Sequence, residues 1–270
     1  MKINWHNILN GDFSPKRIIR SFLIFYILIV IIGLFFSEKL IFPAPQSSYD
    51  ENITNLKFIN SSDGTKLATR FWKSNSEKHV ILYFHGNAED IGQIDGFAKS
   101  LNHLGYSFLA LDYRGYGLSE GKISEQNCYS DALAVYQSTI EMGYDPNQII
   151  IWGRSVGSGS AVDLASKVKS KALILESPFS TAFTVMTKIP IVPFDKFNNL
   201  NKIDEVQAPM FILHGGNDKV ISPWHSEKLF NKHLGPKKRY AIKEAGHNNI
   251  WSYQIHDTLN KIDRFINEHR

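Results

Sequence analysis

Short apolar segments alternate with helical ones along most of this 270-residue chain. Val80–His85 (VILYFH) and Ser107–Tyr113 (SFLALDY) are almost continuously apolar, as strands are when helices cover both faces of a parallel sheet. The other expected strands are Leu56–Asn60, Leu67–Lys73, Ile149–Trp152, Ala172–Leu175, Met210–Leu213 and Arg239–Ile242. The expected helices are Ile91–Leu104, Asn127–Met142, Val156–Val168, Pro223–Leu234 and one that runs to the C-terminus.

This order of elements predicts the fold class. The first two strands are joined by a turn at residues 62–64 (Ser-Asp-Gly), and most of the later strands are separated by helices. We therefore expect one α/β domain with an eight-stranded, mostly parallel, doubly wound sheet. Ligand sites in such sheets lie at the carboxyl ends of the strands, so residues that directly follow a strand are the first functional candidates.

The composition excludes several classes of function. The formal net charge of +4 is too small to indicate a nucleic-acid-binding protein. The single cysteine, Cys128, excludes an intrachain disulfide framework and any cysteine-based zinc site. The chain contains no phosphate-binding G-x-x-x-x-G-K-[ST] loop, no G-x-G-x-x-G motif and no H-E-x-x-H metal motif. We therefore expect no cofactor and no metal.

One pentapeptide, Gly153–Gly157 (GRSVG), matches the G-x-S-x-G motif. It follows an expected strand and opens an expected helix, which is the context that this motif requires. A sharp turn there would lift the Ser155 hydroxyl to the edge of the sheet, and the two glycines would let strand and helix approach closely. The sequence therefore predicts that Ser155 is a nucleophile.

A serine nucleophile needs a general base, and the base needs an orienting acid. Asp218 and His247 follow the last two expected strands, in the chain order Ser, Asp, His that the motif predicts. We expect these two to complete a triad. The rivals fit less well: Asp204 and Glu205 precede their strand, His214 ends a strand before the acid, and His225 and His233 fall in the helical segment that follows.

A loop that follows the first long parallel strand would complete the site. Residues 85–88 read His-Gly-Asn-Ala, and in this arrangement such a loop donates one N–H group to an oxyanion. The residue after the nucleophile donates the other. We assign these two groups to Asn87 and Val156, with Ala88 as the alternative in the loop, and expect His85 to hold the loop in place.

The motifs as a set resemble the α/β-hydrolase-domain family of small membrane-associated serine hydrolases. Its members include serine-aminopeptidase-like bacterial hydrolases and eukaryotic protein depalmitoylases. The resemblance covers residues 53–270 and is carried by HGNAEDIG (85–92), LDYRGYGLSEG (111–121), GRSVGSGSA (153–161), LESPF (175–179), DKFNN (195–199), HGGND (214–218) and GHNN (246–249). It implies the α/β-hydrolase fold and a triad of Ser155, Asp218 and His247. The cysteine-rich N-terminus of the depalmitoylases is absent, so their substrate does not transfer directly.

An apolar run without charge or proline, Phe22–Phe36, precedes the domain and follows several basic residues. Its length and flanks predict a signal anchor that crosses a bacterial inner membrane, with the N-terminus in the cytoplasm and the domain outside it. A cleaved signal peptide and a buried core helix are the alternatives. The expected organisation is a cytoplasmic segment (1–20), an anchor (21–42), a linker (43–52) and a catalytic domain (53–270).

The expected reaction is hydrolysis of carboxylic esters or thioesters, on small-molecule or acylated, lipid-like substrates near the membrane. Residues 177–207, between two of the last strands, leave room only for a minimal lid of one or two short helices. Their apolar side chains either line an acyl-binding lip or cover the sheet as ordinary core. A peptidase or amidase with the same triad, and a membrane-anchored binding protein without activity, are the alternative functions.

Overall fold

The computed structural model describes residues 15–76 and 79–269, which form two compact units that divide between Leu40 and Ile41. In the first unit, helix α2 (Pro15–Phe35) is long and apolar enough to cross a membrane. Its 21 residues span about 31 Å, close to the thickness of a bilayer core. A signal sequence would have the same length and composition, so the anchor over residues 21–42 stays a prediction. Most of the predicted cytoplasmic segment, residues 1–14, lies outside the described residues.

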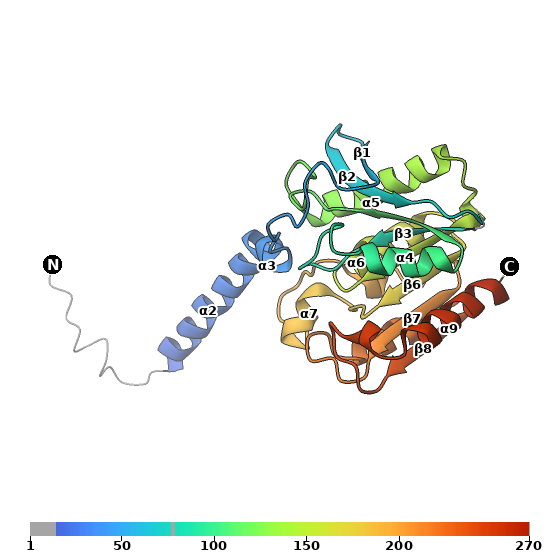
Figure 1. Cartoon of the computed structure of the whole chain (residues 1–270). Coiled ribbons are helices and arrows are strands. Elements are labelled where there is room, and N and C mark those ends of the chain that lie inside the picture. Colours follow the sequence, from blue (N-terminus) through green and yellow to red (C-terminus); the bar gives the residue numbers. More distant parts are fainter. Residues whose placement is uncertain (1–14, 77–78, 270) are drawn as a thin grey trace. The chain divides into compact units, whose positions relative to one another are not determined.

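The second unit is built on an eight-stranded sheet with the order β1-β2-β4-β3-β5-β6-β7-β8 (Figure 1). Strand β1 pairs antiparallel with β2, and β2 pairs antiparallel with β4, whereas all later pairs are parallel. The strands are β1 (Leu56–Asn60), β2 (Lys66–Trp72), β3 (His79–Phe84), β4 (Tyr106–Leu111), β5 (Ile149–Arg154), β6 (Ala172–Glu176), β7 (Met210–Gly215) and β8 (Lys237–Ile242). The predicted fold class is confirmed, including the two leading antiparallel strands.

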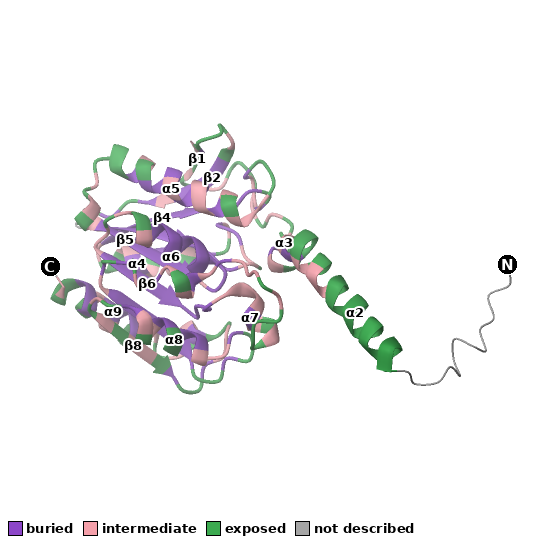
Figure 2. Cartoon of the chain, turned by 180° about the vertical axis from the view of Figure 1, so that it is seen from behind, coloured by how far each residue is buried: buried purple, intermediate pink, exposed green. Residues whose placement is uncertain are grey.

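Helices cover both faces of this sheet. The main helices are α4 (Asp95–His103), α5 (Glu125–Glu141), α6 (Gly157–Lys167), α8 (Trp224–Lys232) and α9 (Ile255–Glu268). Buried side chains of α5, α6 and α8 join one hydrophobic cluster, and those of α4 and α9 join another. Successive residues of β3 alternate between the two clusters, as the two-residue period of a strand requires. The buried interior of the sheet between these layers is visible in Figure 2.

Several element boundaries differ from the sequence prediction by one to four residues, and two of these differences have identifiable reasons. Helix α4 begins at Asp95 rather than Ile91, because the Ile91 amide donates a hydrogen bond to Asp112 Oδ1 (2.9 Å) and residues 91–94 form turns. Strand β8 begins at Lys237 rather than Arg239, because Lys237 is already paired with Met210 of β7. In both cases a partner distant in the sequence sets the boundary.

The segment between β6 and β7 contains only two short helical turns, α7 (Ala182–Thr187) and η2 (Asn199–Asn201). The expected minimal lid is therefore what the chain forms. Its apolar side chains divide into two groups. Phe179 and Phe197 are buried, whereas Met186 and Ile189 are exposed. The first pair is ordinary core, and the second pair remains available for contacts outside the domain.

The predicted linker, residues 43–52, makes specific bonds with the domain. The Ser48 amide donates a hydrogen bond to Asp90 Oδ2 (2.6 Å). The Tyr49 hydroxyl donates to Asp112 and accepts a bond from the Leu118 amide (3.2 Å). Just before this segment, Phe42 is 4% exposed and packs in the core. The chain is therefore fixed to the domain from Phe42 onward.

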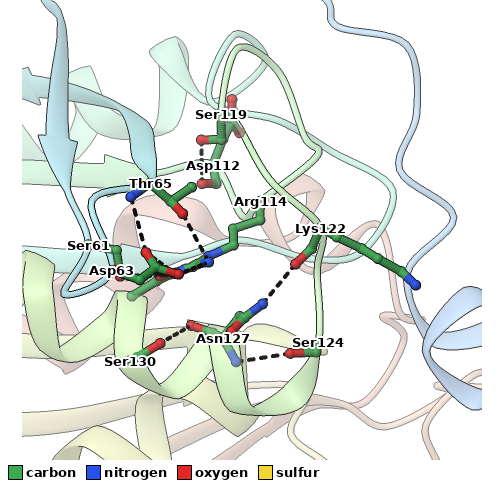
Figure 3. Close-up of polar contacts among 11 residues, drawn as sticks. Ser61, Asp63, Thr65, Asp112, Arg114, Ser119, Lys122, Ser124, Asn127 and Ser130 are labelled. Atoms are coloured by element: carbon green, nitrogen blue, oxygen red, sulfur yellow. Dashed lines mark hydrogen bonds and ion pairs between the residues drawn. The ribbon is translucent and has the colours of Figure 1, made fainter.

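A cluster around Arg114 fixes the β1–β2 turn to helix α5 (Figure 3). We call it the Arg114 cluster, and it comprises Arg114, Ser61, Asp63, Thr65 and Asp131. The guanidinium contacts Asp131 at 2.7 Å and Asp63 at 2.6 Å, and it donates to Ser61 Oγ at 3.1 Å. Ser61 donates in turn to Asp131 (2.6 Å). Arg114 lies in the segment 112–117, and its contacts hold this segment to the β1–β2 turn and to α5.

Candidate active site

A sharp turn between β5 and α6 carries Ser155, which has the left-handed φ of +51°. Glycine is needed on both sides because a Cβ on Gly157 would lie 2.1 Å from the Phe84 carbonyl oxygen, and one on Gly153 would lie 2.6 Å from Ala161 Cβ. The Ser155 amide donates to the Glu176 carbonyl at the end of β6 (2.8 Å). The turn is thus fixed by backbone contacts with two neighbouring strands.

The structure brings the three sequence-predicted residues together. His247 Nε2 lies 3.0 Å from Ser155 Oγ, and His247 Nδ1 lies 2.7 Å from Asp218 Oδ2. Asp218 follows β7 and His247 follows β8. The order of the strands in the sheet therefore places His247 next to Asp218, 29 residues away in the sequence, and next to Ser155, 92 residues away. This chain of contacts has the geometry in which a histidine removes a proton from a serine hydroxyl while a carboxylate fixes the ring.

The Asp218 carboxylate is held in its charged form. Burial would raise its pKa, but hydrogen bonds from His214 and His247 and from the Ile221 amide hold the pKa well below its usual range. His214 Nε2 lies 3.3 Å from Asp218 Oδ2 and 2.9 Å from the Ile221 carbonyl oxygen. The position of His214 at the end of a strand predicts that it is not the base, which agrees with these contacts. Nothing in the sequence indicates that His214 supports the acid.

Free backbone amides lie on the two segments assigned to the oxyanion site. Among the described residues, no acceptor is bonded to the main-chain N–H of Asn87, Ala88 or Val156. The loop is fixed around them, because the Tyr116 hydroxyl donates to the Asn87 carbonyl (2.9 Å) and the Asn87 side chain donates to the Ile41 carbonyl (3.2 Å). Unpaired N–H groups of this kind can receive the negative oxygen of a tetrahedral intermediate.

The His85 side chain fixes the loop of residues 85–88 by its contacts with Gly86 and Asp112. Its Nδ1 lies 2.7 Å from the Gly86 carbonyl oxygen, and its Nε2 lies 3.3 Å from Asp112 Oδ1. The side chain is fully buried and packs against Tyr113, with ring centroids 4.4 Å apart and the rings tilted by 48°. Burial would lower the pKa of His85, but the Asp112 carboxylate raises it overall. These contacts agree with the structural role that the sequence suggested for His85.

The remaining rival residues lie in other contacts. Asp204 pairs with Lys232 (3.2 Å). His233 Nδ1 lies 3.2 Å from the Ile203 carbonyl oxygen. His225 accepts from the Ser180 amide (3.2 Å), and burial lowers its pKa to about 4.

A charged network that the sequence does not predict lies beside Ser155. We call it the Arg154 cluster, and it comprises Arg154, Glu89, Glu176 and Trp251. Arg154 contacts Glu89 at 2.6 Å and Glu176 at 3.2 Å. The other oxygen of Glu89 accepts from the Gly86 amide (2.6 Å), and the Trp251 indole donates to Glu176 (3.0 Å). The cluster therefore connects the last residues of β5 and β6 with the segments that follow β3 and β8. Arg154 occupies the second position of G-x-S-x-G, where any residue is allowed, so the motif does not mark it as functional.

Glu176 is the fully buried member of the Arg154 cluster. It is 1% exposed, and its Oε2 has no hydrogen-bond partner within the described part of the chain. Burial raises its pKa, and the positive charge of Arg154 only partly opposes that effect. Arg154 and the Trp251 indole both contact Oε1, so the buried Oε2 beside Ser155 lacks a direct partner of its own among the described residues.

Residues 75–198 match a protein family described as "Serine aminopeptidase, S33". Human alpha/beta hydrolase domain-containing protein 17B is 33% identical over 228 residues, which cover 82% of this chain and 78% of the human protein. Mouse alpha/beta hydrolase domain-containing protein 17C is 34% identical over 195 residues, which cover 71% of this chain and 60% of the mouse protein.

Solved structures with the same fold include an esterase, Pf2001 of Pyrococcus furiosus. It superposes with a TM-score of 0.68 at 20% identity and covers 83% of this chain and 96% of the esterase. Mouse alpha/beta hydrolase domain-containing protein 10 superposes with a TM-score of 0.63 at 19% identity, covering 79% of this chain and 98% of that protein. At this level of identity the superpositions establish the shared fold.

Proposed function

The chain belongs to the alpha/beta hydrolase domain-containing protein 17 family and is a hydrolase, and we propose from this premise that it cleaves carboxylic esters or thioesters. The nucleophile is Ser155, with His247 as general base and Asp218 as orienting acid. The single observation that carries the proposal is the pair of contacts at 3.0 and 2.7 Å that join Ser155, His247 and Asp218.

The reaction proceeds in two steps. His247 Nε2 takes the proton of Ser155 Oγ as that oxygen attacks the substrate carbonyl carbon, and the carbonyl oxygen becomes an oxyanion. His247 then gives the proton to the leaving alcohol or thiol, which departs and leaves an acyl-enzyme. Water repeats the sequence and releases the acid. Asp218 stays charged throughout, because its pKa is held well below its usual range, and it stabilises the positive imidazolium.

The amides of Asn87 and Val156 bind the oxyanion in this proposal. Each such donor lowers the barrier by about 2.7–4 kcal/mol in comparable sites. Support for these two comes from their position beside Ser155 in the chain or in the neighbouring loop, and from their lack of acceptors among the described residues. The Ala88 amide shares the second property, so it remains the alternative donor in the loop.

Reaction with a fluorophosphonate probe tests the mechanism directly. The wild-type chain should be labelled, whereas Ser155→Ala and His247→Ala should not. Ser166→Ala on helix α6 and the exposed His256→Ala are matched controls, and both should be labelled like the wild type. An unlabelled wild type with native circular dichroism would refute the proposed nucleophile and favour a binding protein.

A second candidate function, peptide or amide hydrolysis, is favoured by the match of residues 75–198 to the S33 aminopeptidase family. The same triad serves both reactions, so substrates must separate them. A chain-length series of p-nitrophenyl esters beside a panel of aminoacyl anilides would do so. We expect turnover of the esters only. Faster turnover of the anilides would favour the peptidase.

We further propose that α2 remains in the membrane as an anchor and that the hydrolase domain lies on the extracytoplasmic side. The basic residues before the helix and its length support this topology. Alkaline phosphatase fused to the C-terminus should be active in a bacterial host, and a cytoplasmic reporter at the same place should be inactive. The opposite pair of results would reverse the orientation.

A further inference from the structure

A short segment before the sheet, residues 41–49, packs against the loop that carries the proposed oxyanion amides. We call it the strap. It belongs to the same compact unit as the sheet, because that unit begins at Ile41. The Ile41 carbonyl accepts a hydrogen bond from the Asn87 side chain (3.2 Å), and the Phe42 ring is buried in the core. The strap is therefore packed into the domain beside this loop.

The direction of each loop amide is linked to the carbonyl in the same peptide plane. These peptide bonds are trans and planar, so the C=O and N–H groups of one plane point in opposite directions. The Gly86 carbonyl shares a plane with the Asn87 N–H, and the Asn87 carbonyl shares one with the Ala88 N–H. A contact that fixes either carbonyl therefore also fixes the amide that is a candidate oxyanion donor.

Tyr49 of the strap reaches the first of these carbonyls through two fully buried side chains. The Tyr49 hydroxyl donates to Asp112, and burial and the negative charge of Asp112 raise its pKa, so it stays protonated. Asp112 Oδ1 lies 3.3 Å from His85 Nε2, and His85 Nδ1 lies 2.7 Å from the Gly86 carbonyl oxygen. This series of contacts ends on the peptide plane that holds the Asn87 N–H.

Phe42 of the strap reaches the second carbonyl through Tyr116. The two rings meet edge to face, with centroids 6.5 Å apart, and Tyr116 is fully buried. The Tyr116 hydroxyl donates to the Asn87 carbonyl (2.9 Å), in the plane that holds the Ala88 N–H. The strap therefore supports both candidate donors, and it does so by two separate routes.

We propose that the strap is part of the oxyanion site, in which Tyr49 and Phe42 are positioning residues for the loop amides. The inference rests on the proposed hydrolase function. Neither residue touches the substrate, and both act by preventing a peptide plane from turning. The catalytic unit then begins at Ile41 rather than at the first strand. A plane that turns away removes a donor from the transition state, so kcat falls while KM changes little.

Tyr49→Phe tests the first route, and Tyr106→Phe is its matched control. The Tyr106 hydroxyl also donates to a carboxylate, Asp263 Oδ1 (2.6 Å), but Tyr106 begins β4, at the opposite end of the sheet from the candidate site. Each substitution removes one hydrogen bond between a hydroxyl and a carboxylate. The measurements on the full chain in detergent are kcat and KM for a short-chain p-nitrophenyl ester and Ki for an alkyl trifluoromethyl ketone, which forms a serine adduct that carries an oxyanion.

The expected result separates positioning from stability. Tyr49→Phe should lower kcat and weaken ketone binding by the same factor, about tenfold, with KM changed less than about twofold, because misplacement of a catalytic group by about 1 Å can cost about 100-fold. Tyr106→Phe should leave kcat, KM and Ki at their wild-type values. A Tyr49→Phe variant that loses only stability, with kcat and Ki unchanged, would overturn the inference.

Hydrogen–deuterium exchange follows the loop without reference to activity. The Ile91 amide donates to Asp112 Oδ1 (2.9 Å) and the Gly86 amide to Glu89 Oε1 (2.6 Å), so a peptide covering residues 85–92 reports how firmly the loop is held. Its exchange should be faster in Tyr49→Phe and unchanged in Tyr106→Phe. Wild-type exchange in Tyr49→Phe would overturn the inference. Faster exchange in a chain whose wild type hydrolyses no ester would refute the proposed function and leave the hold of the strap on the loop in place.

Phe42→Leu tests the second route and identifies the donor. Leucine keeps the core position apolar but removes the ring that packs on Tyr116. Because Asn87 is the assigned donor, kcat should fall more in Tyr49→Phe than in Phe42→Leu. The reverse order would support the strap and assign the donor to Ala88. Wild-type kcat in both variants would overturn the inference.

Discussion

Two arginine clusters in this molecule look alike and differ in what surrounds them. In the Arg114 cluster every carboxylate that meets the guanidinium has further hydrogen bonds, and the members join a turn to a helix away from Ser155. In the Arg154 cluster, Glu176 is fully buried with one oxygen unpaired among the described residues, and the members join four segments at the carboxyl ends of the strands, beside Ser155. Similar ion-pair clusters can therefore differ in what they join: one holds a turn to a helix, and the other holds the segments around the proposed active site.

The largest expected effect is on stability, at Arg114. Arg114→Met leaves the buried Asp131 without its cation, and removing one partner of a buried pair costs about 3–5 kcal/mol. Urea unfolding of the full chain in detergent measures the loss. Fluorophosphonate labelling of the molecules that remain folded should stay at the wild-type rate. A wild-type urea midpoint for Arg114→Met, or slow labelling of its folded molecules, would contradict the view that the Arg114 cluster acts on stability alone.

An intermediate effect on stability, with a larger effect on rate, is expected at Arg154. Arg154→Met should cost about 1–3 kcal/mol, because Glu176 already has a raised pKa and can take up a proton. The loops at Gly86 and Trp251 are held together through the contacts of Arg154 with Glu89 and Glu176, and the substitution removes those contacts. We therefore expect kcat for a short-chain ester to fall on the order of 10–100-fold, with KM little changed. Arg154→Lys, which restores the charge, should recover part of kcat. Unchanged kcat in Arg154→Met would make this cluster purely structural.

The smallest effect concerns pH, and its sign differs between the clusters. The pKa of Glu176 is raised in the folded state, so the wild type loses stability as the pH rises from about 4 through that pKa. Glu176→Gln should therefore become more stable relative to the wild type as the pH rises from about 4 toward 7. Denaturant midpoints across this range give the slope.

Asp63 of the Arg114 cluster provides the opposite case. Hydrogen bonds from Arg114 and Thr65 lower its pKa, so its contribution is present above about pH 4 and is lost as the pH falls through the folded pKa. Because Asp63 is exposed, Asp63→Asn should change the midpoint only slightly, and the change should vanish in 1 M salt. Slopes of the same sign for Glu176→Gln and Asp63→Asn would contradict the assigned environments.

The sequence predicted those parts of the site that depend on local order. Continuous apolar runs gave the strands, and G-x-S-x-G with the chain order Ser155, Asp218, His247 gave three residues that the structure brings together. These signals are local because each residue lies at or just after the end of a strand. The parallel sheet then brings the ends of its strands, and so these residues, to the same place. The same reasoning named the loop at Asn87.

The parts that sequence did not predict depend on pairs distant along the chain. Glu89 and Arg154 are 65 residues apart, and Tyr49 and Asp112 are 63 apart. Nothing in the neighbourhood of Glu89 marks it as a partner, because an exposed glutamate and a buried one have the same local pattern. The bonds of residues 43–52 to the domain were missed for the same reason, since two prolines and two serines also fit a free linker.

The left-handed backbone of Ser155 has a consequence for how this chain can change over generations. An L-residue with a side chain gives up about 1–2 kcal/mol in that conformation, whereas glycine does not. With Ser155 as the proposed nucleophile, selection for hydrolysis keeps at position 155 a residue that is not the best one for folding. A descendant released from that selection would gain thermal stability by exchanging Ser155 for glycine. An inactive relative with glycine at this position should therefore have the higher melting temperature.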